Sequence, residues 1–479
     1  MRGVISAAGY VPYRRLDRSE IATFFGTGGA QGTRAVASYD EDTTTMGQAA
    51  ADLALRLTNV KPDAVWLATS APAYLEKTNA ATIHAALRLD PAVDALDFGG
   101  AVRSGVGALR TALAGKGTTL VVAADSRDGL PTGADEAAAG DGAAAVLVAD
   151  DAVDRSKGRV VAEYLGGAGR TLEITERWRT PGSARSRSWE ERFAAAVYGP
   201  AAAEAWKAAV AAAGLGGVSD IDHLAVAGLN ARGVAAAVRA IGGDPGRAVD
   251  SLLDTVGNTA TAHPALLLCS ALEQARPGET IAVVALADGV EVLVLRTTEA
   301  LADHRWAAPV TAQVAAGRPM SYGRFLAWRQ MVHIEPPNRP PPSRPSSSAA
   351  HRRADWKYGF TGSRDRSTGM VHLPPARVSE KGGATDDMDP APMAHTLGTV
   401  ASFTVDRLAY SPSPPTVFAV VDFDGGGRAP LELTDADADE VHVGMRVVGT
   451  FRRLYTADDI HNYFWKVRPV RPGSPEASA

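Results

Sequence analysis

Apolar runs alternate with helical patterns along the first 300 residues. The segments DAVWLATS (63–70) and TTLVVAADS (118–126) are short, almost continuous apolar runs with polar ends, which predicts buried strands. In the segments 43–57 and 78–89, apolar residues recur at helical spacing. Helices that alternate with strands of this kind indicate a sheet that is covered on both faces.

The same order of elements recurs after residue 198. The pattern predicts helices over 199–214, 231–243 and 258–275. It also predicts a strand over 220–230 and a hairpin of two strands over 280–295. Because the chain has no repeat of about 20–50 residues, this recurrence indicates two related halves rather than a solenoid. Between the halves, the polar, basic and aromatic segment WRTPGSARSRSWEERF (178–193) is predicted to be a loop over a site or an interface.

The pattern changes near residue 306. The segment 335–348 contains six prolines, which lack a backbone N–H, so it is predicted to be a semi-rigid tether. Strand patterns separated by glycine or proline then follow over 398–410, 415–428, 429–435, 444–455 and 461–470. They predict a small β-barrel of the OB-fold type. The sequence DFDGGGR (422–428) is predicted to be a hairpin turn, because the Gly-Lys-Ser/Thr of a phosphate-binding loop does not follow it.

Composition narrows the functional classes. The 479 residues are 46% hydrophobic and 22% charged, as in ordinary globular proteins. A net charge of −5 gives no electrostatic reason to expect nucleic acid as a partner, and a single cysteine excludes an internal disulfide framework. No apolar run reaches about 18 residues, and the first residues lack the apolar region of a signal peptide. We therefore expect a cytoplasmic protein that does not enter a membrane.

Four segments resemble the thiolase superfamily, in particular hydroxymethylglutaryl-CoA synthase and the type-three ketoacyl synthases. They are DFGGAVRSGVGAL (97–109), GDGAAAVLV (140–148), DIDHLAVAGLN (220–230) and GNTATAHPALLL (257–268). The resemblance implies an α/β fold with five layers, αβαβα, made of two pseudo-duplicated halves, which agrees with the recurrence described above. It also implies acyl-CoA as substrate or ligand, and a homodimer. It assigns no residue to the binding of a cofactor.

Most of the catalytic positions of that family carry other residues in this chain. Val102 stands where the family has its nucleophilic cysteine at the start of a helix, Ala227 stands at the histidine position, and Ser70 stands at the glutamate position. Only Asn258 is retained. Because valine offers no nucleophile, the resemblance implies that no covalent acyl-enzyme forms. Cys269 lies in the apolar segment ALLLCSAL and is expected to be a buried, inert thiol.

Aldol chemistry on a β-hydroxyacyl-CoA remains available without a thiol. It needs donors for the thioester enolate oxygen and a base near the β-hydroxyl group. His263, five residues after Asn258, is the candidate base, and Asn258 and Tyr74 are the other candidate catalytic residues. A structural role at a helix start is the alternative for His263. His84 and Asp97 lie in segments expected to face a site, and each also has a structural alternative.

The segment 321–470 resembles the acyl-CoA-associated OB-fold proteins that are often fused to thiolase-like enzymes. Those relatives carry a zinc ribbon with two Cys-x-x-Cys pairs before the barrel. This chain keeps the spacing, but the four positions are Asp365, Thr368, Ser379 and Gly382. The resemblance therefore implies no zinc here. The aromatic segment 460–469 is expected to dock on the first domain or close over a pantetheine arm rather than bind bases, because the acidic segment 435–443 lies near it in sequence.

These observations predict five segments. They are a thiolase-like domain over 1–300, a proline-rich linker with a helical segment over 301–355, a degenerate zinc-ribbon-like segment without zinc over 356–390, an OB-fold domain over 391–472 and a disordered tail over 473–479.

Two functions remain open at this point. The first is a carbon–carbon lyase of the retro-aldol type that acts on a β-hydroxyacyl-CoA, with steroid or aromatic side chains as candidate acyl groups. The second is a catalytically inactive scaffold that binds a thiolase-like partner protein and CoA intermediates. A condensing enzyme with a displaced nucleophile is the least favoured alternative.

Overall fold

The computed structural model describes residues 1–56, 58–150, 158–189, 191–471 and 476. The chain forms two compact units. The first unit comprises Met1–Ala37, Ala50–Ala80 and Pro91–Tyr322, and the second comprises Ser38–Ala49, Ala81–Asp90 and Gly323–Ala479. The predicted tail over 473–479 lies outside the described residues except for residue 476. No helix in the described part of the chain has the length and apolar character needed to cross a membrane.

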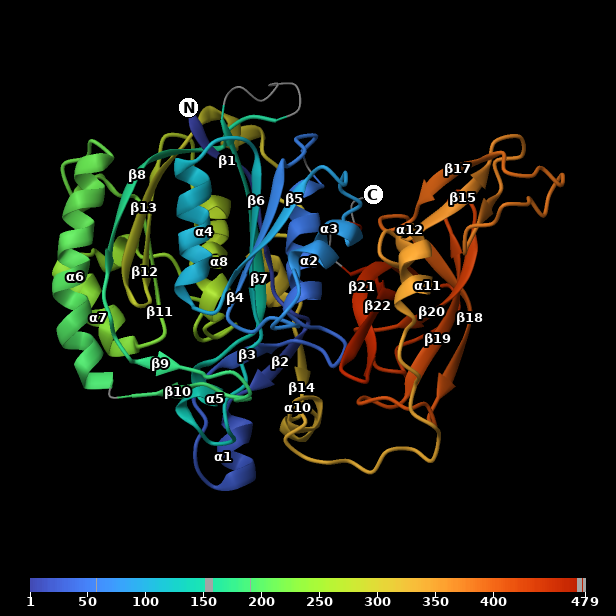
Figure 1. Ribbon diagram of the computed structural model, residues 1–479. Coiled ribbons are helices and arrows are strands. Elements are labelled where there is room, and N and C mark those ends of the chain that lie inside the picture. Colours follow the sequence, from blue (N-terminus) through green and yellow to red (C-terminus); the bar gives the residue numbers. More distant parts are fainter. Residues whose placement is uncertain (57, 151–157, 190, 472–475, 477–479) are drawn as a thin grey trace. The chain divides into compact units, whose positions relative to one another are not determined.

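A mixed nine-stranded sheet organises the first unit, in the order β11-β12-β13-β8-β1-β7-β6-β4-β5 (Figure 1). Its strands are β1 (Arg2–Tyr10), β4 (Ala64–Thr69), β5 (Asp94–Gly99), β6 (Thr119–Asp125), β7 (Gly142–Asp150), β8 (Ala162–Thr171), β11 (His223–Gly228), β12 (Thr280–Leu286) and β13 (Gly289–Thr297). The neighbours β5, β4 and β6 run parallel, as do β11 and β12, and all other neighbours are antiparallel. Each half therefore combines parallel strands with an antiparallel hairpin.

The two halves of the sheet meet at a short seam. Strands β1 and β8 pair only at Gly3 with Glu163 and at Val4 with Ala162. A Cβ atom on Gly3 would lie 2.0 Å from the carbonyl oxygen of Ala162. Glycine is required there because the two backbones approach too closely for a side chain.

Two helices lie at the centre of the first unit, α4 (Arg103–Ala114) and α8 (His263–Gln274) (Figure 1). One buried cluster contains side chains of both helices together with side chains of β1, β6, β7, β11, β12 and β13. Helices α6 (Glu191–Ala212) and α7 (Ala231–Ile241) pack on the other face of β8, β11 and β13. The predicted α/β architecture with helices on both faces of the sheet is confirmed.

Several sequence-based element boundaries differ from the structure, among them the start of α6, which is at Glu191 rather than at residue 199. The predicted helix over 258–275 begins only at His263, because the residues before it form a short 3-10 turn, Ala260–Ala262, in which Ala260 has a φ of 48°. The predicted loop over 178–193 contains two short paired strands, β9 (Arg177–Trp178) and β10 (Arg187–Ser188). Boundaries of this kind depend on tertiary contacts, so the local periodicity of the sequence does not predict them.

Smaller elements complete the first unit. Strands β2 (Arg14–Asp17), β3 (Thr33–Val36) and β14 (Arg318–Met320) form a three-stranded sheet, and the helices are α1 (Ser19–Phe25), α5 (Ala134–Ala138) and α9 (Val310–Ala315). Helices α2 (Thr43–Leu55) and α3 (Ala80–Ala86) each contribute residues to both units.

A closed five-stranded barrel forms the core of the second unit, in the order β18-β19-β20-β22-β21. Its strands are β18 (Gly398–Asp406), β19 (Thr416–Phe423), β20 (Arg428–Leu433), β21 (Arg446–Ala457) and β22 (Ile460–Pro469). This confirms the predicted OB-fold. The segment DFDGGGR forms the turn between β19 and β20, with positive φ at its three glycines. Strands β15 (Thr361–Asp365), β16 (Val371–His372) and β17 (Met388–Pro392) form a separate sheet, and α10 (Tyr322–Trp328), α11 (Ser347–Arg352) and α12 (Ala354–Lys357) precede it.

A buried ionic network joins the segment 38–49 to the barrel within the second unit. The Lys466 ammonium lies 3.0 Å from a carboxylate oxygen of Asp40 and 2.6 Å from one of Glu432. Arg452 pairs with Glu41 and, at 2.7 Å, with Asp435. A charge removed from water is stabilised only when it is paired, so these contacts hold the segment in one position.

Candidate functional site

Four of the residues singled out in the sequence surround one small cavity in the first unit. Val102 contributes from the start of α4, Ala227 from the end of β11, and Asn258 and His263 from the segment that leads into α8. The remaining lining residues are Val106, Gly228, Leu229, Ala260, Pro264, Ala285, Leu286 and Ala287. The cavity therefore lies where α4 begins and where the parallel strands β11 and β12 end.

Position 102, directly before α4, offers no nucleophile. Val102 is the residue immediately before the helix, and its backbone is already helical. A helix N-terminus favours a thiolate, but the isopropyl group of valine has nothing to ionise. Gly105, one turn further, lets α4 approach the segment before α8, since a Cβ atom there would lie 2.2 Å from the Thr261 carbonyl oxygen. The small residues of this segment therefore serve close packing.

Asn258 is held by two side-chain hydrogen bonds. Its amide nitrogen donates to the carbonyl oxygen of Gly228 at 2.8 Å, and its amide oxygen accepts from the backbone N–H of Ala260 at 2.9 Å. The first bond connects it to the end of β11, and the second shapes the turn that precedes α8. Only the first bond uses the amide N–H2 group that an enolate-binding role would require, and that group has two N–H donors.

His263 is buried and neutral. The residue is only 2% exposed, and its Nδ1 atom lies 3.3 Å from the Thr259 hydroxyl oxygen. Burial, together with the charge of Arg127, lowers the pKa of His263 to about 4. The imidazole is therefore uncharged at neutral pH, and its low basicity makes it a weak acceptor of a substrate proton.

Ser70 belongs to a different hydrogen-bonded cluster, centred on Asp125. One carboxylate oxygen of Asp125 accepts from the Thr69 hydroxyl and the Ser70 N–H, and the other accepts from the Ser70 hydroxyl and the Thr261 N–H, each at 2.9 Å. The sequence analysis did not single out Asp125. Its only signal in the sequence is its place at the end of the apolar segment 118–126.

Tyr74, His84 and Asp97 do not line the cavity. The backbone of Tyr74 exchanges hydrogen bonds with the side chain of Asn79, whose own N–H donates to Asp97 at 2.7 Å. Asp97 also accepts from the N–H of Ala80, the first residue of α3. A ring nitrogen of His84 lies 3.0 Å from the Asp90 carbonyl oxygen. The hydrogen bonds of these three residues are therefore with nearby loops and helix ends, and they serve the local structure.

The cavity is too small for an acyl group in this conformation. Its volume is about 10 Å³, which is enough for about one water molecule. Val102 and Val106 contribute branched side chains to its wall, and Ala227 contributes a methyl group. Any acyl group that entered would have to displace these side chains.

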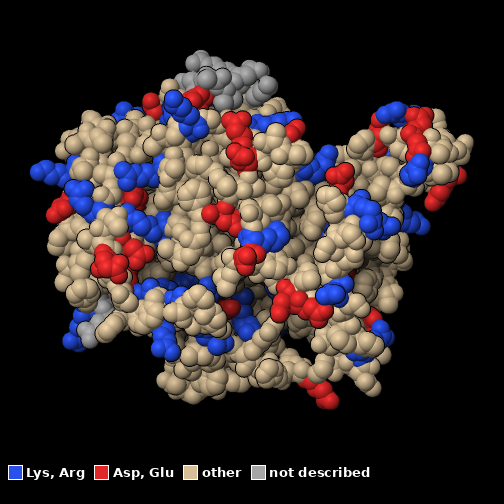
Figure 2. Space-filling view, viewed as in Figure 1, with Lys and Arg blue, Asp and Glu red and all other residues tan. Residues whose placement is uncertain are grey.

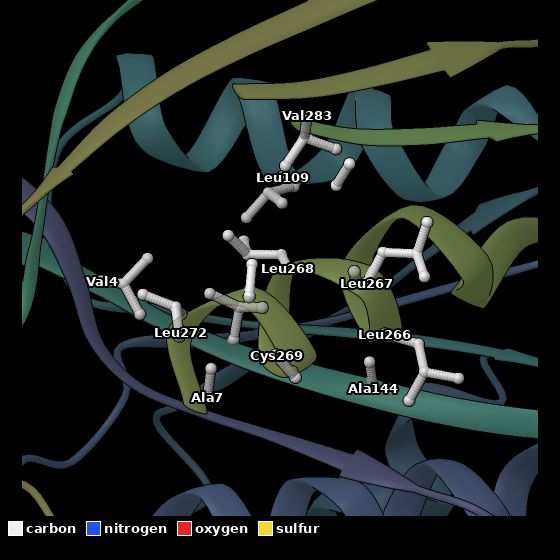
Figure 3. Close-up of a cluster of buried hydrophobic side chains, with 14 of the residues drawn as sticks. Val4, Ala7, Leu109, Ala144, Leu266, Leu267, Leu268, Cys269, Leu272 and Val283 are labelled. Atoms are coloured by element: carbon white, nitrogen blue, oxygen red, sulfur yellow. The ribbon is translucent and has the colours of Figure 1, made fainter. Parts of the chain in front are cut away.

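Cys269 lies in the hydrophobic core rather than at the cavity. It is fully buried on α8, among the apolar side chains shown in Figure 3, which include Ala7, Leu268 and Leu272. Burial raises the pKa of its thiol well above the usual value. A thiol that stays protonated and out of solvent is not a nucleophile.

Arginine side chains surround the loops beside the cavity. The Arg127 guanidinium donates to the Asn258 carbonyl oxygen at 3.0 Å and pairs with Asp135, and burial lowers its pKa to about 10. Arg177 binds the two carboxylate oxygens of Asp135 at 2.8 and 2.9 Å, and Arg179 donates to the Ser70 carbonyl oxygen. Figure 2 shows Lys and Arg side chains in a hollow over β9 and β10. The segment 178–193 thus contacts the Asp125 cluster through Arg179.

In the second unit, the residues at the four positions where the resemblance places the cysteines of a zinc ribbon lie close together. The Asp365 carboxylate accepts hydrogen bonds from the Thr368 hydroxyl at 2.7 Å and from Ser367 at 2.7 and 2.8 Å. A Cβ atom on Gly382 would lie 3.4 Å from the Thr368 methyl group. Hydrogen bonds from Ser379, Thr368 and Ser367 hold the pKa of Asp365 well below its usual value. Because one carboxylate and two hydroxyls replace four thiolates, these residues do not fit zinc.

The comparisons with known proteins agree with this division. Residues 211–296 match the family model for the C-terminal part of 3-oxoacyl-[acyl-carrier-protein] synthase III, and residues 394–452 match that for the C-terminal OB-fold domain of ChsH2. The hydroxymethylglutaryl-CoA synthase of Methanopyrus kandleri is 25% identical over 349 residues, which span 69% of this chain and 97% of the relative. The chain joins a thiolase-like domain to an OB-fold domain.

Two solved structures show the same fold for the thiolase-like domain. The structure of MvaS in complex with 3-hydroxy-3-methylglutaryl coenzyme A has a TM-score of 0.55 and 20% identity, and the match covers 71% of this chain and 94% of MvaS. The structure of hydroxymethylglutaryl-CoA synthase complexed with CoA has a TM-score of 0.58 and 16% identity, with coverage of 72% and 94%. At these identities the likeness concerns the fold.

Proposed function

We propose that this thiolase-like OB-fold protein is a subunit that binds acyl-CoA thioesters without covalent attachment and assembles with a thiolase-like chain. The observation that carries the proposal is the composition of the cavity at the start of α4. Val102, which the resemblance places at the position of the nucleophile, lines this cavity, the side chain of Asn258 is hydrogen-bonded, and that of His263 is weakly basic. Such a site can bind a thioester but has no group with which to form an acyl-enzyme.

Acyl-CoA is the ligand class that the fold and the relatives support. Two of the structures with this fold are described as complexes with CoA or with 3-hydroxy-3-methylglutaryl coenzyme A. The exposed guanidinium of Arg187 on β10 would suit the phosphates of such a ligand. Because the cavity admits about one water molecule, the acyl group would stay at its mouth unless Val102 and Val106 moved.

Strand β5 is the surface that we propose for pairing with a thiolase-like chain. It is at one end of the sheet and, in the described part of the chain, pairs with no strand other than β4. Leu96 on this strand is 51% exposed, whereas β11, at the other end, has no exposed residue and has a further bridge between Leu224 and Ala248. An exposed edge strand offers free backbone groups to a second strand. A second copy of this chain or a related thiolase-like protein would suit it.

The retro-aldol lyase is the second candidate function, and one observation favours it. His263 and Asn258 line the same cavity, as a base and a donor for that reaction would have to. In the reaction, the base removes the β-hydroxyl proton and the Cα–Cβ bond breaks. The bonding electrons form the thioester enolate, whose protonation gives a shorter acyl-CoA beside an aldehyde or ketone. The low pKa of His263 is unfavourable for the first step.

Incubation of the purified chain with a set of β-hydroxyacyl-CoA thioesters distinguishes the two functions. The proposed subunit should release no carbonyl product by itself, but CoA should stabilise its fold. Ligand at about 100 times its dissociation constant should add about 2.7 kcal/mol to the free energy of unfolding. Release of an aldehyde or ketone would establish the lyase instead. The absence of any stabilisation by CoA would refute both.

The pairing surface has its own test. Light scattering should show that Leu96→Glu lowers the apparent mass of the assembly, because a charge on each β5 strand opposes edge-to-edge pairing. Leu408→Glu, at an exposed position of the second unit, is the control and should leave the mass unchanged. A wild-type chain that is monomeric both alone and with a thiolase-like protein would refute the proposed pairing.

A further inference from the structure

A groove in the second unit has no role in the function proposed above. It lies between the segment that includes α11 and α12 and the hairpin formed by β21 and β22. Its volume is about 250 Å³, close to the lower limit of known small-molecule sites, about 300 Å³. Its wall includes the apolar side chains of Leu454, Trp356 and Phe464, and it opens to solvent.

Aromatic contacts hold the apolar wall in place. The ring centroids of Trp356 and Phe464 lie 5.3 Å apart, and those of Trp356 and Phe360 lie 5.4 Å apart. Phe360 is fully buried in the barrel core. The wall is therefore anchored in the fold, and an apolar ligand would meet a preformed surface.

Two cations belong to the groove, and no acidic residue lines it in the described part of the chain. The Lys357 ammonium donates to the Tyr463 carbonyl oxygen at 2.8 Å and to the side-chain oxygen of Asn462. An ammonium has three N–H donors, so one more acceptor can be accommodated. Arg353, one helical turn earlier, is exposed at the groove. Its planar guanidinium suits a carboxylate, which accepts two parallel hydrogen bonds.

We propose that this groove binds a small amphipathic carboxylate, an alkyl or aryl acid. Its apolar part would lie against Trp356 and Phe464, and its carboxylate between Arg353 and Lys357. Burial lowers the pKa of Lys357 to about 8, and a bound anion would offset this effect by favouring the charged ammonium. The inference does not depend on the function proposed for the first unit, because all the residues involved lie in the second.

Calorimetric titration of the full chain with octanoate and with the neutral octanamide tests the proposal. The two probes have the same alkyl chain, so their difference reports the carboxylate. Octanoate should bind at least about tenfold more tightly. Arg353→Gln and Lys357→Met should each remove most of this difference. Arg352→Gln, which changes an exposed arginine of α11 that does not line the groove, should retain it.

Three results would overturn the proposal. Equal affinities for octanoate and octanamide would show an apolar groove without a carboxylate site. Binding of octanoate that neither Arg353→Gln nor Lys357→Met weakens would place the ligand elsewhere. No detectable binding at concentrations on the order of 1 mM would exclude the site for this class of ligand. Because Arg353 is exposed, its variant keeps the test valid even if Lys357→Met fails to fold.

Discussion

The side-chain amide of Asn258 donates a hydrogen bond of 2.8 Å to the backbone carbonyl oxygen of Gly228. Gly228 ends β11 and directly follows Ala227, which lines the cavity. The asparagine therefore connects the end of a strand to the turn before α8. In this chain it stabilises the framework around the cavity.

Replacement of Asn258 by alanine should lower the stability of the fold. The change leaves the Gly228 carbonyl and the Ala260 N–H without their partner in a buried position, at a cost of about 1–3 kcal/mol. Urea denaturation measures this difference. Asn338→Ala, in the exposed proline-rich segment, is the control and should change little. Equal stability of the two variants would contradict the structural role assigned to Asn258.

Val102→Cys should create a reactive thiol where the wild-type chain has none. The start of α4 lowers the pKa of a thiol, whereas Cys269 is buried and stays protonated. We expect iodoacetamide to label this variant once per chain in its folded state and to leave the wild type unlabelled. Val332→Cys, at an exposed position away from a helix start, provides the comparison. Slower labelling at position 102 than at position 332 at pH 6 would refute the expected activation.

His263 should make the fold less stable in acid. Its pKa is about 4 in the folded chain against about 6.5 when unfolded. Between these values the unfolded state binds one more proton, so stability is fully present above pH 6.5 and is lost as the pH falls towards 4. The loss should amount to about 3 kcal/mol.

The matched variants for this prediction are His263→Gln and His333→Gln. Only the first should flatten the dependence of the unfolding free energy on pH between 4 and 6.5, because His333 is exposed. Other groups that titrate in this range are the same in both proteins. Identical pH profiles would show that His263 keeps an ordinary pKa.

The zinc-ribbon-like segment should be independent of metal. Asp365 is the only anionic residue among the four expected ligand positions, and its carboxylate already accepts hydrogen bonds from Ser367 and Thr368. Elemental analysis of the purified chain should find no stoichiometric zinc, and EDTA should leave the melting temperature unchanged. Asp365→Asn should lower that temperature, since it weakens the acceptor at the centre of this cluster. One zinc per chain, or melting caused by EDTA, would contradict this account.

The sequence predicted those helices and strands that a local pattern of apolar, polar and turn residues determines. Alternation and turn residues marked the five barrel strands, and continuous apolar runs marked buried strands such as β4 and β6. The location of the segment 38–49 in the second unit was not predictable in this way. Asp40 and Glu41 look like ordinary surface acids until the fold brings Arg452 and Lys466 to them.

For the candidate site too, contacts between segments distant in sequence were not predictable from local patterns. The replaced positions Val102 and Ala227 were found by resemblance, and the structure brings them to one cavity with Asn258 and His263. The role of Asp125 was missed because its partners, Ser70 and Thr261, are distant in sequence. The size of the cavity depends on how side chains from four segments pack, and no local pattern reports it.

Mass spectrometry of the intact chain after incubation with acyl-CoA tests the central claim most directly. If the site works without covalent attachment, the mass should equal that of the untreated protein at every time point. An added acyl mass that hydroxylamine removes would contradict the claim. It would show that a thioester forms on Cys269, the only cysteine in the chain.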